Sequence, residues 1–390
     1  MKLYLNDVGL LCAAGTTRPE ILARLLAGDR SGLVANDEFG IDTIVGQCGA
    51  DLPEIDPRYR IYNCRNNRLL LAALSQIRVT VDKMVDRYGA GRIGIVLGTS
   101  TSGVRSTELA LAYQAQFGGL PDQFHYKQQQ MGAGADFLAA YLGVTGPAYT
   151  ISTACSSSGK AFASARRLIA QDLCDAVVVG GADSLCGLTI NGFAALESLS
   201  TGYCKPFGLH RNGINIGEAA SLFVLSKQEG PVQLLGIGAS SDAYHFSAPD
   251  PVGTAVMAAM QKALADAGKR PEEVDYLNLH GTATLLNDAM ESKAVNAVFG
   301  SQVAASSSKG MTGHTLGAAA ALELAFCWML LAENEQGVLI PNINDDEWDT
   351  ELAPLHLVKQ GERLGRRLRV CQSNSFAFGG NNLSIVVARV

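Results

Sequence analysis

The sequence predicts an α/β protein made of two joined halves. Short runs rich in Val, Ile and Leu, which are typical of strands, alternate with helix-like patterns along the whole chain. Two of these runs, 92–98 and 176–181, are apolar almost throughout and end in glycine, as strands covered on both faces do. At about 150 residues per domain, the 390 residues allow two or three domains or one large two-part fold. A small binding module is therefore excluded.

The clearest helix is expected over 70–88. Apolar side chains recur there at 3.6-residue spacing, and Gly89 follows at the place where a helix commonly ends. The same pattern over 256–267, closed by Gly268, predicts a second helix. The apolar run 275–279 after it predicts a strand.

A soft boundary divides the chain near residue 230. The Gly-Pro pair at 230–231 indicates a turn between two strands, expected over 219–225 and 232–237. The composition changes little along the chain, and no linker tract separates two globules. We therefore expect an N-terminal half over 1–230 and a C-terminal half over 231–390 that are tightly joined.

The charge balance limits the partners of the protein. Lys and Arg number 31 against 37 Asp and Glu, which gives a net charge of −6. No basic field exists to bind a phosphate backbone, so nucleic acid is excluded as a partner. Charged residues make up 17% and hydrophobic residues 47%, against roughly 25% charged residues in an average globular chain. This surplus of apolar residues predicts that part of the surface is buried between subunits.

Neither export nor membrane insertion is expected. Residues 1–15 place acidic and amide side chains where a signal peptide has a basic start and an unbroken apolar centre. The longest apolar stretch, 318–332, contains Glu323 and is shorter than the roughly 20 residues of a membrane span, so it predicts a buried helix. The nine cysteines form no C-x-x-C pair and the six histidines show no i, i+4 spacing. We therefore expect a cytoplasmic protein with reduced thiols and no metal site.

Cys155 is the first candidate for chemistry. It lies in ISTACSSSG, between a strand-like run and a helix whose apolar face includes Phe162, Ala165 and Ile169. A sulfur near a helix N-terminus is favoured as the thiolate, which is the nucleophilic form. The small neighbours leave room for a substrate carbonyl. Taken alone, a buried structural cysteine is the commoner alternative.

His280 is the second candidate. A strand delivers it into a Gly-Thr turn within DYLNLHGTATLLND. A neutral histidine either donates an N–H to an oxygen that gains charge or accepts a proton. Thr282 and Thr284, one alternation apart, add hydroxyls that are able to line a polar channel. The alternative for His280 alone is a core histidine with its hydrogen bonds satisfied.

Two further segments carry polar groups among small or aromatic residues. Lys309 and His314 are the polar side chains of SSSKGMTGHTLGAAAALE, which lacks the residue order of a phosphate-binding P-loop, so nucleotide binding is not expected. NSFAFGGNN, at 374–382, combines two aromatic side chains with a Gly-Gly pair. That composition suits a mobile loop with a bulky gate and free backbone N–H groups, and a plain hairpin turn is the alternative.

Together the four segments resemble the β-ketoacyl-[acyl-carrier-protein] synthases, the condensing enzymes of type II fatty-acid and polyketide systems. The resemblance rests on TACSS, HGT-x-T, K-x-M-T-G-H and N-S-F-x-F-G-G-x-N in this order, and it spans nearly the whole chain. It implies a thiolase-like fold, in which two similar α/β halves form a five-layered αβαβα core, and it implies a dimer. It also implies an acyl carrier protein as partner, whose phosphopantetheine arm makes a separate cofactor unnecessary.

The resemblance assigns the reacting groups. Cys155 would take the acyl group from a carrier-protein thioester, which divides one difficult transfer into two easier ones. His280 and His314 would donate hydrogen bonds to the malonyl thioester oxygen during decarboxylation. The backbone N–H groups of Cys155 and Phe378 would hold the tetrahedral oxyanion, and Phe378 would also act as a gate.

The resemblance also assigns supporting groups, which fall into four sets. Two residues would orient the histidine loop, two would bind the pantetheine arm, two would contact the acyl chain, and two basic residues would dock the acidic carrier protein. In that order the pairs are Lys309 and Glu323, Thr282 and Thr284, Thr101 and Phe193, and Arg65 and Arg68. For the two arginines, a solvated helix start is an equal alternative.

Departures from the family pattern favour a specialised polyketide or polyene synthase as readily as a housekeeping fatty-acid enzyme. The segment 206–220 loses two acids and a glycine while it keeps Arg211 and Glu218, which puts any ion pair or cation site there in doubt. Ala377 replaces a usual glycine and Asn381 a common threonine. Thr101 occupies a place where a bulky aliphatic side chain often reaches into the partner subunit's acyl tunnel, and a small polar residue predicts a longer tunnel.

Three alternatives belong to other classes. A chain-length-factor-like subunit shares the fold without catalysing condensation, but such subunits usually lack the cysteine that is present here. A degradative thiolase has a second catalytic cysteine in its C-terminal glycine-rich loop, whereas Cys371 lies outside that loop. A papain-like protease would need its own local cysteine signature. Whether the chain forms a homodimer or a heterodimer with a related ketosynthase or chain-length-factor chain is left open by the sequence.

Overall fold

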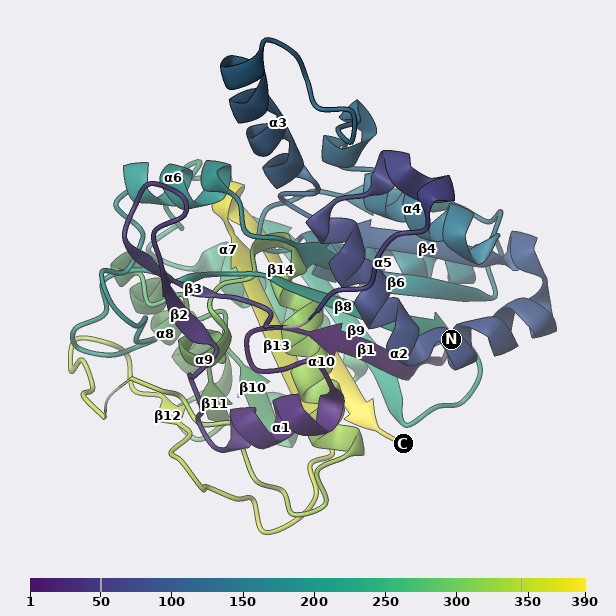
Figure 1. Cartoon of the computed structure of the whole chain (residues 1–390). Coiled ribbons are helices and arrows are strands. Elements are labelled where there is room, and N and C mark those ends of the chain that lie inside the picture. The colour runs from purple at the N-terminus through teal and green to yellow at the C-terminus, as the bar shows by residue number, and fades with distance from the viewer. Residues whose placement is uncertain (50, 345) are drawn as a thin grey trace.

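The computed structural model describes residues 1–49, 51–344 and 346–390, and its centre is one twisted sheet (Figure 1). Eleven strands of the described chain form this sheet, and three short strands form a separate one. In spatial order the strands of the large sheet are β12 (His356–Leu357), β11 (Ala304–Ser306), β10 (Tyr276–Asn278), β13 (Val370–Ala377), β14 (Asn381–Arg389), β9 (Val232–Ser241), β1 (Leu3–Leu11), β8 (Ala219–Ser226), β6 (Ala176–Asp183), β4 (Ile93–Gly98) and β5 (Ala148–Ile151). The small sheet contains β2 (Leu33–Asn36), β3 (Thr43–Gly46) and β7 (Ile216–Gly217).

The strand order is an internal repeat that the letters of the sequence do not reveal. The N-terminal half runs β5-β4-β6-β8-β1, and the C-terminal half, apart from the added edge strand β12, runs β11-β10-β13-β14-β9. Without β12, both halves have the order third, second, fourth, fifth, first. The strand directions repeat as well, because β4 is parallel to both of its neighbours and β10 is parallel to both of its own. The two halves join where β1 pairs with β9 in antiparallel register.

Helices fill the space between the half-sheets and cover both outer faces (Figure 1). Two lie in the middle, α5 (Ser157–Ala170) and α10 (Ala319–Ala332), and each contacts strands of both halves. On the outside, α2 (Arg65–Tyr88) and α4 (Ala133–Leu142) pack on the N-terminal half, and α7 (Thr254–Ala267) packs on the C-terminal half beside α8 (Leu285–Phe299). The remaining α-helices are α1 (Arg18–Leu26), α3 (Val104–Phe117), α6 (Gly187–Ala195) and α9 (Lys309–Thr312). The result is the expected αβαβα layering.

The elements predicted from periodicity are present with small shifts at their ends. The helix expected over 70–88 is α2, which begins earlier at Arg65 and ends at Gly89 with a left-handed φ of 82°. The two fully apolar runs are the buried strands β4 and β6. The stretch 318–332 forms α10, which is buried all round, as expected for a helix between two sheets. Within the described ranges, no helix is long and apolar enough to cross a membrane.

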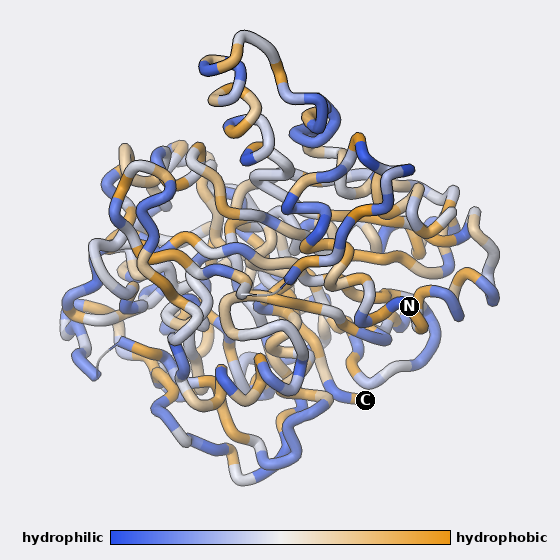
Figure 2. The backbone as a smooth tube through the Cα atoms, in the orientation of Figure 1, coloured by the Kyte–Doolittle hydropathy of each residue, from blue (hydrophilic) through white to orange (hydrophobic). Residues whose placement is uncertain are grey.

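Hydrophobic residues are frequent along the central strands, and they also occur on one projecting helix (Figure 2). This helix is α3, which stands out from the body of the molecule in Figure 1. Its exposed apolar residues include Leu109, Leu111 and Phe117. At one end of the large sheet, β5 is the last strand, so one of its edges has no partner within the described chain. An apolar helix and an open strand edge together are typical of a surface that another chain covers.

Gly98, at the end of β4, allows the nucleophile's helix to approach the sheet closely. A Cβ at this position would lie 2.1 Å from the backbone nitrogen of Ser158, well inside contact distance. Gly98→Ala is therefore expected to lower the free energy of unfolding by about 1–3 kcal/mol, the usual cost of overpacking, in chemical denaturation. The matched control is Gly91→Ala, where the nearest atom would be 3.7 Å away. An equal loss in both variants would contradict this account.

Candidate active site

Cys155 lies in a tight turn between β5 and α5. The preceding residue, Ala154, has a left-handed φ of 51°, which an alanine adopts only when its surroundings enforce it. The side chain of Ser157 supplies that support, because its hydroxyl accepts from the N–H of Thr153 at 2.8 Å and donates to the carbonyl of Ala154. The turn thus holds the sulfur at the start of α5, in the position that the sequence predicted.

His280 follows β10 and is held through its backbone. The N–H groups of His280 and Gly281 each donate to the carboxylate of Glu291 on α8, both at 2.7 Å. Glu291 is fully buried, and burial raises the pKa of its carboxyl group to about 7. Gly281 has a φ of 38°, and a Cβ there would lie 2.5 Å from Ser307, so this turn requires glycine.

His314 is fixed at both its backbone and its ring. Its N–H donates to the carbonyl of Asn215 at 2.7 Å, and its carbonyl accepts from the N–H of Gly217 at 2.9 Å. The backbone N–H of Leu316 donates to the ring Nδ1 at 3.1 Å. Because Nδ1 is an acceptor here, the proton of the neutral ring sits on Nε2.

The three predicted residues converge on one site. The Nε2 of His314 lies 3.0 Å from the Sγ of Cys155, and the rings of His280 and His314 meet edge-on with centroids 5.4 Å apart. One ligand atom from each of the three side chains lies within 4.8 Å of the others. All three line a cavity of about 410 Å³. A nucleophilic sulfur and two imidazoles therefore face the same enclosed space.

Lys309 and Glu323 form a buried ion pair beneath the histidines. The Lys309 ammonium contacts the Glu323 carboxylate, and it donates to the carbonyl of His280 at 2.6 Å. Its Nζ also lies 3.5 Å from the Nδ1 of His280. An ammonium group has donors only, so it favours the same tautomer in His280 as in His314, with the proton on Nε2. Both imidazoles thus present an N–H to the cavity.

Burial controls the protonation of the reacting groups. Burial, followed by the nearby Lys309 ammonium, lowers the pKa of His280 and of His314 well below its usual value. Burial also raises the pKa of the Cys155 thiol to about 12. The helix N-terminus was expected to favour the thiolate of Cys155, but loss of hydration outweighs the nearby Lys309 charge and the Phe378 backbone N–H. At neutral pH the resting site is a thiol with two neutral imidazoles.

Alkylation of Cys155 by iodoacetamide is expected to accelerate about tenfold per pH unit between pH 7 and pH 10. The thiolate is the reactive form, and below a pKa of about 12 its fraction rises tenfold with each unit. Peptide mass spectrometry at a series of pH values gives the rate at this cysteine alone. A plateau above pH 8 would show that the helix N-terminus and Lys309 outweigh burial.

All of the residues predicted to bind substrate or act as the gate line this cavity, except Thr101. Thr282, Thr284, Phe193 and Phe378 all line the cavity of Cys155. The two threonine hydroxyls are 2.9 Å apart, and the rings of Phe193 and Phe378 pack with centroids 5.5 Å apart. Thr101 does not line it, because its side chain is fully buried and its hydroxyl bonds to Asp183 at 2.8 Å. The expected contact of Thr101 with the acyl chain is therefore not made within the cavity of its own chain.

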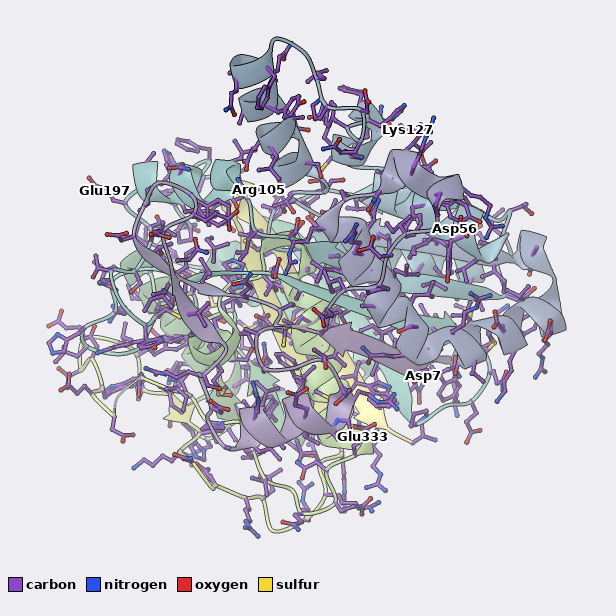
Figure 3. The ribbon with its side chains drawn as sticks, in the orientation of Figure 1. Asp7, Asp56, Arg105, Lys127, Glu197 and Glu333 are labelled. Atoms are coloured by element: carbon purple, nitrogen blue, oxygen red, sulfur yellow. The ribbon has the colours of Figure 1, made fainter. Side chains whose placement is uncertain are left out.

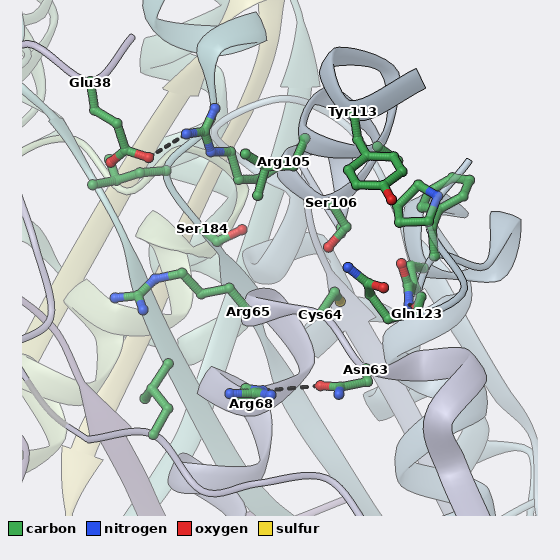
Figure 4. A pocket seen from close by; sticks show the side chains of 18 of the residues that line it. Glu38, Asn63, Cys64, Arg65, Arg68, Arg105, Ser106, Tyr113, Gln123 and Ser184 are labelled. Carbon is green, nitrogen blue, oxygen red and sulfur yellow. Dashed lines mark hydrogen bonds and ion pairs between the residues drawn. The ribbon is translucent and has the colours of Figure 1, made fainter. Parts of the chain in front are cut away.

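The two arginines proposed for carrier docking are already paired. Both line a second cavity of about 1040 Å³ beside α3, shown in Figure 4. Arg65 donates to the buried Glu218 at 2.8 Å, and Arg68 donates to the exposed Glu54 at 2.9 Å. Removing Arg65 would leave Glu218 buried without its partner, so this arginine has a structural role that the sequence did not indicate.

Two residues of the altered segment 206–220, Arg211 and Glu218, form ion pairs with distant parts of the chain. Arg211 is buried and pairs with Asp349 at 2.6 Å, from a loop more than 130 residues further along the chain. Glu218 pairs with Arg65, as described above. The doubt raised by the lost acids is resolved for these two residues. Ala377 has an ordinary extended φ of −96°, so no glycine is needed there, and Asn381 accepts from Lys160 at 2.7 Å.

Two buried carboxylates were missed by the sequence analysis. Glu291 holds the loop of His280, and Asp183 holds a turn next to His314, where it accepts from the N–H of Gly317. A signal existed for Asp183, because an acid directly after the apolar run 176–181 places a charge at the end of a buried strand. No comparable signal marks Glu291, which lies among other polar residues of α8.

A buried cysteine beside two N–H-presenting imidazoles, on a thiolase-like fold, is the arrangement expected of a thiol-based acyltransferase of the condensing type. The protein-family model described as "Beta-ketoacyl synthase, N-terminal domain" matches residues 30–230. A second family model, described as "Beta-ketoacyl synthase, C-terminal domain", matches residues 232–345. The chain belongs to the β-ketoacyl synthase family. This result confirms the resemblance drawn from the four sequence segments.

Individual relatives agree with this assignment over the full length of the chain. Nodulation protein E from Rhizobium meliloti is 32% identical and aligns over 100% of this chain and 99% of its own. The 3-oxoacyl-[acyl-carrier-protein] synthase 2 of Coxiella burnetii is 29% identical over the same shares. Among solved structures, a chain of the complex between the ketosynthase ApeO and its chain length factor ApeC, from Xenorhabdus doucetiae, is 44% identical with a TM-score of 0.94, and the match covers 100% of this chain and 98% of that one.

Proposed function

We propose that this chain catalyses decarboxylative Claisen condensation, extending an acyl group carried on Cys155 by two carbons taken from a malonyl group on an acyl carrier protein. The observation that carries the proposal is the 3.0 Å contact between the Cys155 sulfur and the His314 Nε2, with His280 facing the same cavity. No separate cofactor is required, because the carrier protein brings its own phosphopantetheine arm.

In the first half-reaction, the sulfur of Cys155 attacks the acyl thioester and forms a new carbon–sulfur bond. The bond to the pantetheine sulfur breaks, and the thiol proton of Cys155 leaves with that sulfur. The backbone N–H groups of Cys155 and Phe378 both act to lower the pKa of the Cys155 thiol, which indicates that they lie beside its sulfur. They are therefore placed to stabilise the oxyanion that forms on the attacked carbonyl.

In the second half-reaction, the carbon–carbon bond to the malonyl carboxylate breaks and carbon dioxide leaves. The electron pair of that bond remains on the thioester as an enolate. Both Nε2–H groups are fixed as donors before substrate enters, by Leu316 for His314 and by Lys309 for His280. Preorganised donors of this kind stabilise developing negative charge without reorganisation.

The same electron pair then forms the new carbon–carbon bond to the acyl carbonyl. Cys155 departs as a thiolate, takes up a proton and regenerates the resting thiol. The raised pKa of this thiol, about 12, means that the resting enzyme keeps its proton at neutral pH. The product leaves on the carrier protein as a β-ketoacyl thioester.

The pathway is proposed to be that of a specialised polyketide or aryl polyene rather than general fatty-acid synthesis. The 44% identity to a chain of a ketosynthase–chain length factor complex, against 29% to a 3-oxoacyl-[acyl-carrier-protein] synthase 2, supports this choice. A small Thr101 and the altered segment 206–220 support the same choice. The protein is proposed to act in the cytoplasm.

A related chain is proposed to cover α3 and the open edge of β5. ApeO is described in complex with a chain length factor, and the exposed Leu109, Leu111 and Phe117 of α3 supply an apolar contact surface. Residues of the partner would then complete the acyl tunnel. A second copy of this chain is the other outcome, and size-exclusion chromatography with and without the co-expressed related chain distinguishes the two.

The test is mass spectrometry of the protein after incubation with a set of acyl-carrier proteins, before any malonyl donor is added. We expect an acyl mass on the peptide that contains Cys155, and the preferred chain identifies the pathway. Loading by saturated chains alone would contradict the polyene assignment. Absence of loading, both alone and with the related chain, would favour a non-catalytic, chain-length-factor-like subunit.

A further inference from the structure

A buried carboxylate at the end of β6 connects the loop after β4 to the loop of His314. Asp183 is fully buried. Its Oδ1 accepts from the hydroxyls of Thr99 and Thr101, at 2.5 and 2.8 Å, and from two backbone N–H groups of residues 100–101, both at 2.8 Å. Its Oδ2 accepts from the N–H of Gly317 at 2.5 Å, and from the Ser100 N–H at 3.0 Å, a longer bond than the one this N–H makes to Oδ1. One carboxylate therefore joins the N-terminal half, through residues 99–101, to the C-terminal half, through Gly317.

The bond to Gly317 acts on His314 through consecutive backbone groups. Leu316, which donates to the imidazole Nδ1, has a left-handed φ of 52°. A leucine in that conformation is strained, and it remains there only where its neighbours are held. The next N–H, of Gly317, is held by Asp183, and a Cβ on Gly317 would lie 2.8 Å from the Asp183 carboxylate. The anchor and the hydrogen bond that sets the imidazole tautomer are thus adjacent.

We propose that Asp183 is a positioning residue that holds His314 as an Nε2–H donor, by fixing Gly317 and with it the strained Leu316 turn. This inference rests on the proposed function, and it adds a role that is specific to the decarboxylation half-reaction. Charge-assisted bonds to backbone N–H groups are among the stronger hydrogen bonds in proteins. The residue touches neither substrate nor the reacting atoms.

The chemistry of the two oxygens provides a selective test through Asp183→Asn. Four donors converge on Oδ1, so the amide oxygen will occupy that position and the NH₂ group will replace Oδ2. The NH₂ group then faces the N–H of Gly317, and two donors repel. The loop after β4 keeps its acceptor, whereas the His314 loop loses its own.

Two half-reactions are measured on wild type and variant: acyl loading on Cys155, by mass spectrometry, and release of acetyl-carrier protein from malonyl-carrier protein. We expect Asp183→Asn to slow decarboxylation about 10- to 100-fold, the range for a displaced catalytic group, and loading less than about threefold. The ¹⁵N shifts of the His314 ring are expected to change from those of a single Nε2–H tautomer to a mixture. Gly317→Ala, which forces the same loop away from Asp183, should reproduce the effect if the first variant does not fold.

The matched control is Asp7→Asn. Asp7 also accepts from a backbone N–H, of Val8 at 2.9 Å, and it shares Arg18 with Glu333. Figure 3 labels both acids, and Asp7 does not line the active-site cavity. This variant should leave both half-reactions and the His314 shifts unchanged. A wild type that shows neither half-reaction would refute the proposed function itself. A wild type that shows both, with equal losses or no loss in Asp183→Asn and an unchanged tautomer, would overturn the positioning role.

Discussion

Cys155→Ala is expected to abolish condensation, with a loss on the order of 10⁴-fold or more, as for removal of other covalent nucleophiles. The sulfur forms the only bond that retains the acyl group between the two half-reactions. Without it, the two imidazoles still donate to the malonyl enolate, but no acyl carbonyl is held beside that enolate. Transfer of radiolabelled acyl groups from carrier protein to product measures the loss directly.

The matched control is Cys174→Ala. Cys174 is another fully buried cysteine, but it lies just before β6 and outside the active-site cavity. Both variants remove one buried sulfur, so both should cost similar stability in thermal unfolding, whereas only Cys155→Ala should stop catalysis. Product formation by Cys155→Ala at more than a few per cent of the wild-type rate would mean that the acyl group is carried elsewhere.

The elements that periodicity predicted are those whose burial is nearly uniform along one face. The helix α2 places Leu70, Leu74 and Ile77 toward the sheet at 3.6-residue spacing, and β4 is apolar at almost every position because helices cover both of its faces. Such patterns can be recognised in a single sequence, because the residue type at each position reflects how that position is buried. The repeat of strand order cannot be recognised in the sequence, since the strands that pair lie far apart in the chain.

The active site also has features that the sequence predicts and features that it does not. Cys155, His280 and His314 were identified because each lies in a short segment whose neighbours are themselves distinctive. Their convergence and their protonation were not predictable, because both depend on how deeply the two halves bury them. The thiol pKa shows this most clearly, since the local signal of a helix N-terminus was correct and burial still reversed its effect.

The roles of Arg65 and Asp183 were hidden for a different reason. Each pairs with a group from a distant segment, Arg65 with Glu218 and Asp183 with Gly317. A sequence shows that a charge is present but not which partner neutralises it. Surface docking was therefore a reasonable interpretation of Arg65, and only the buried partner reveals its structural role.

His280→Ala is expected to lower the rate of malonyl decarboxylation about 10²- to 10³-fold, the range for losing one oxyanion donor. The ring of His280 faces the cavity with its Nε2–H free for the enolate oxygen, because Lys309 lies beside Nδ1. Within the described chain, His314 rather than His280 makes the hydrogen-bond contact with the Cys155 sulfur. Acyl loading should therefore remain within about threefold of wild type in His280→Ala, since no transition-state donor to the attacking sulfur is lost.

The variant His314→Ala distinguishes the role of His314 from that of His280. It removes both a donor to the enolate and the group 3.0 Å from the Cys155 sulfur, so both half-reactions should slow, with decarboxylation the more affected. The control is His356→Ala, at the far edge of the sheet, where the ring pairs with Glu362 at 2.6 Å. Loading and decarboxylation that fall by one common factor in His280→Ala would refute the division of roles. Losses confined to decarboxylation in His280→Ala and shared by loading in His314→Ala would establish that the histidine nearer the sulfur serves both steps.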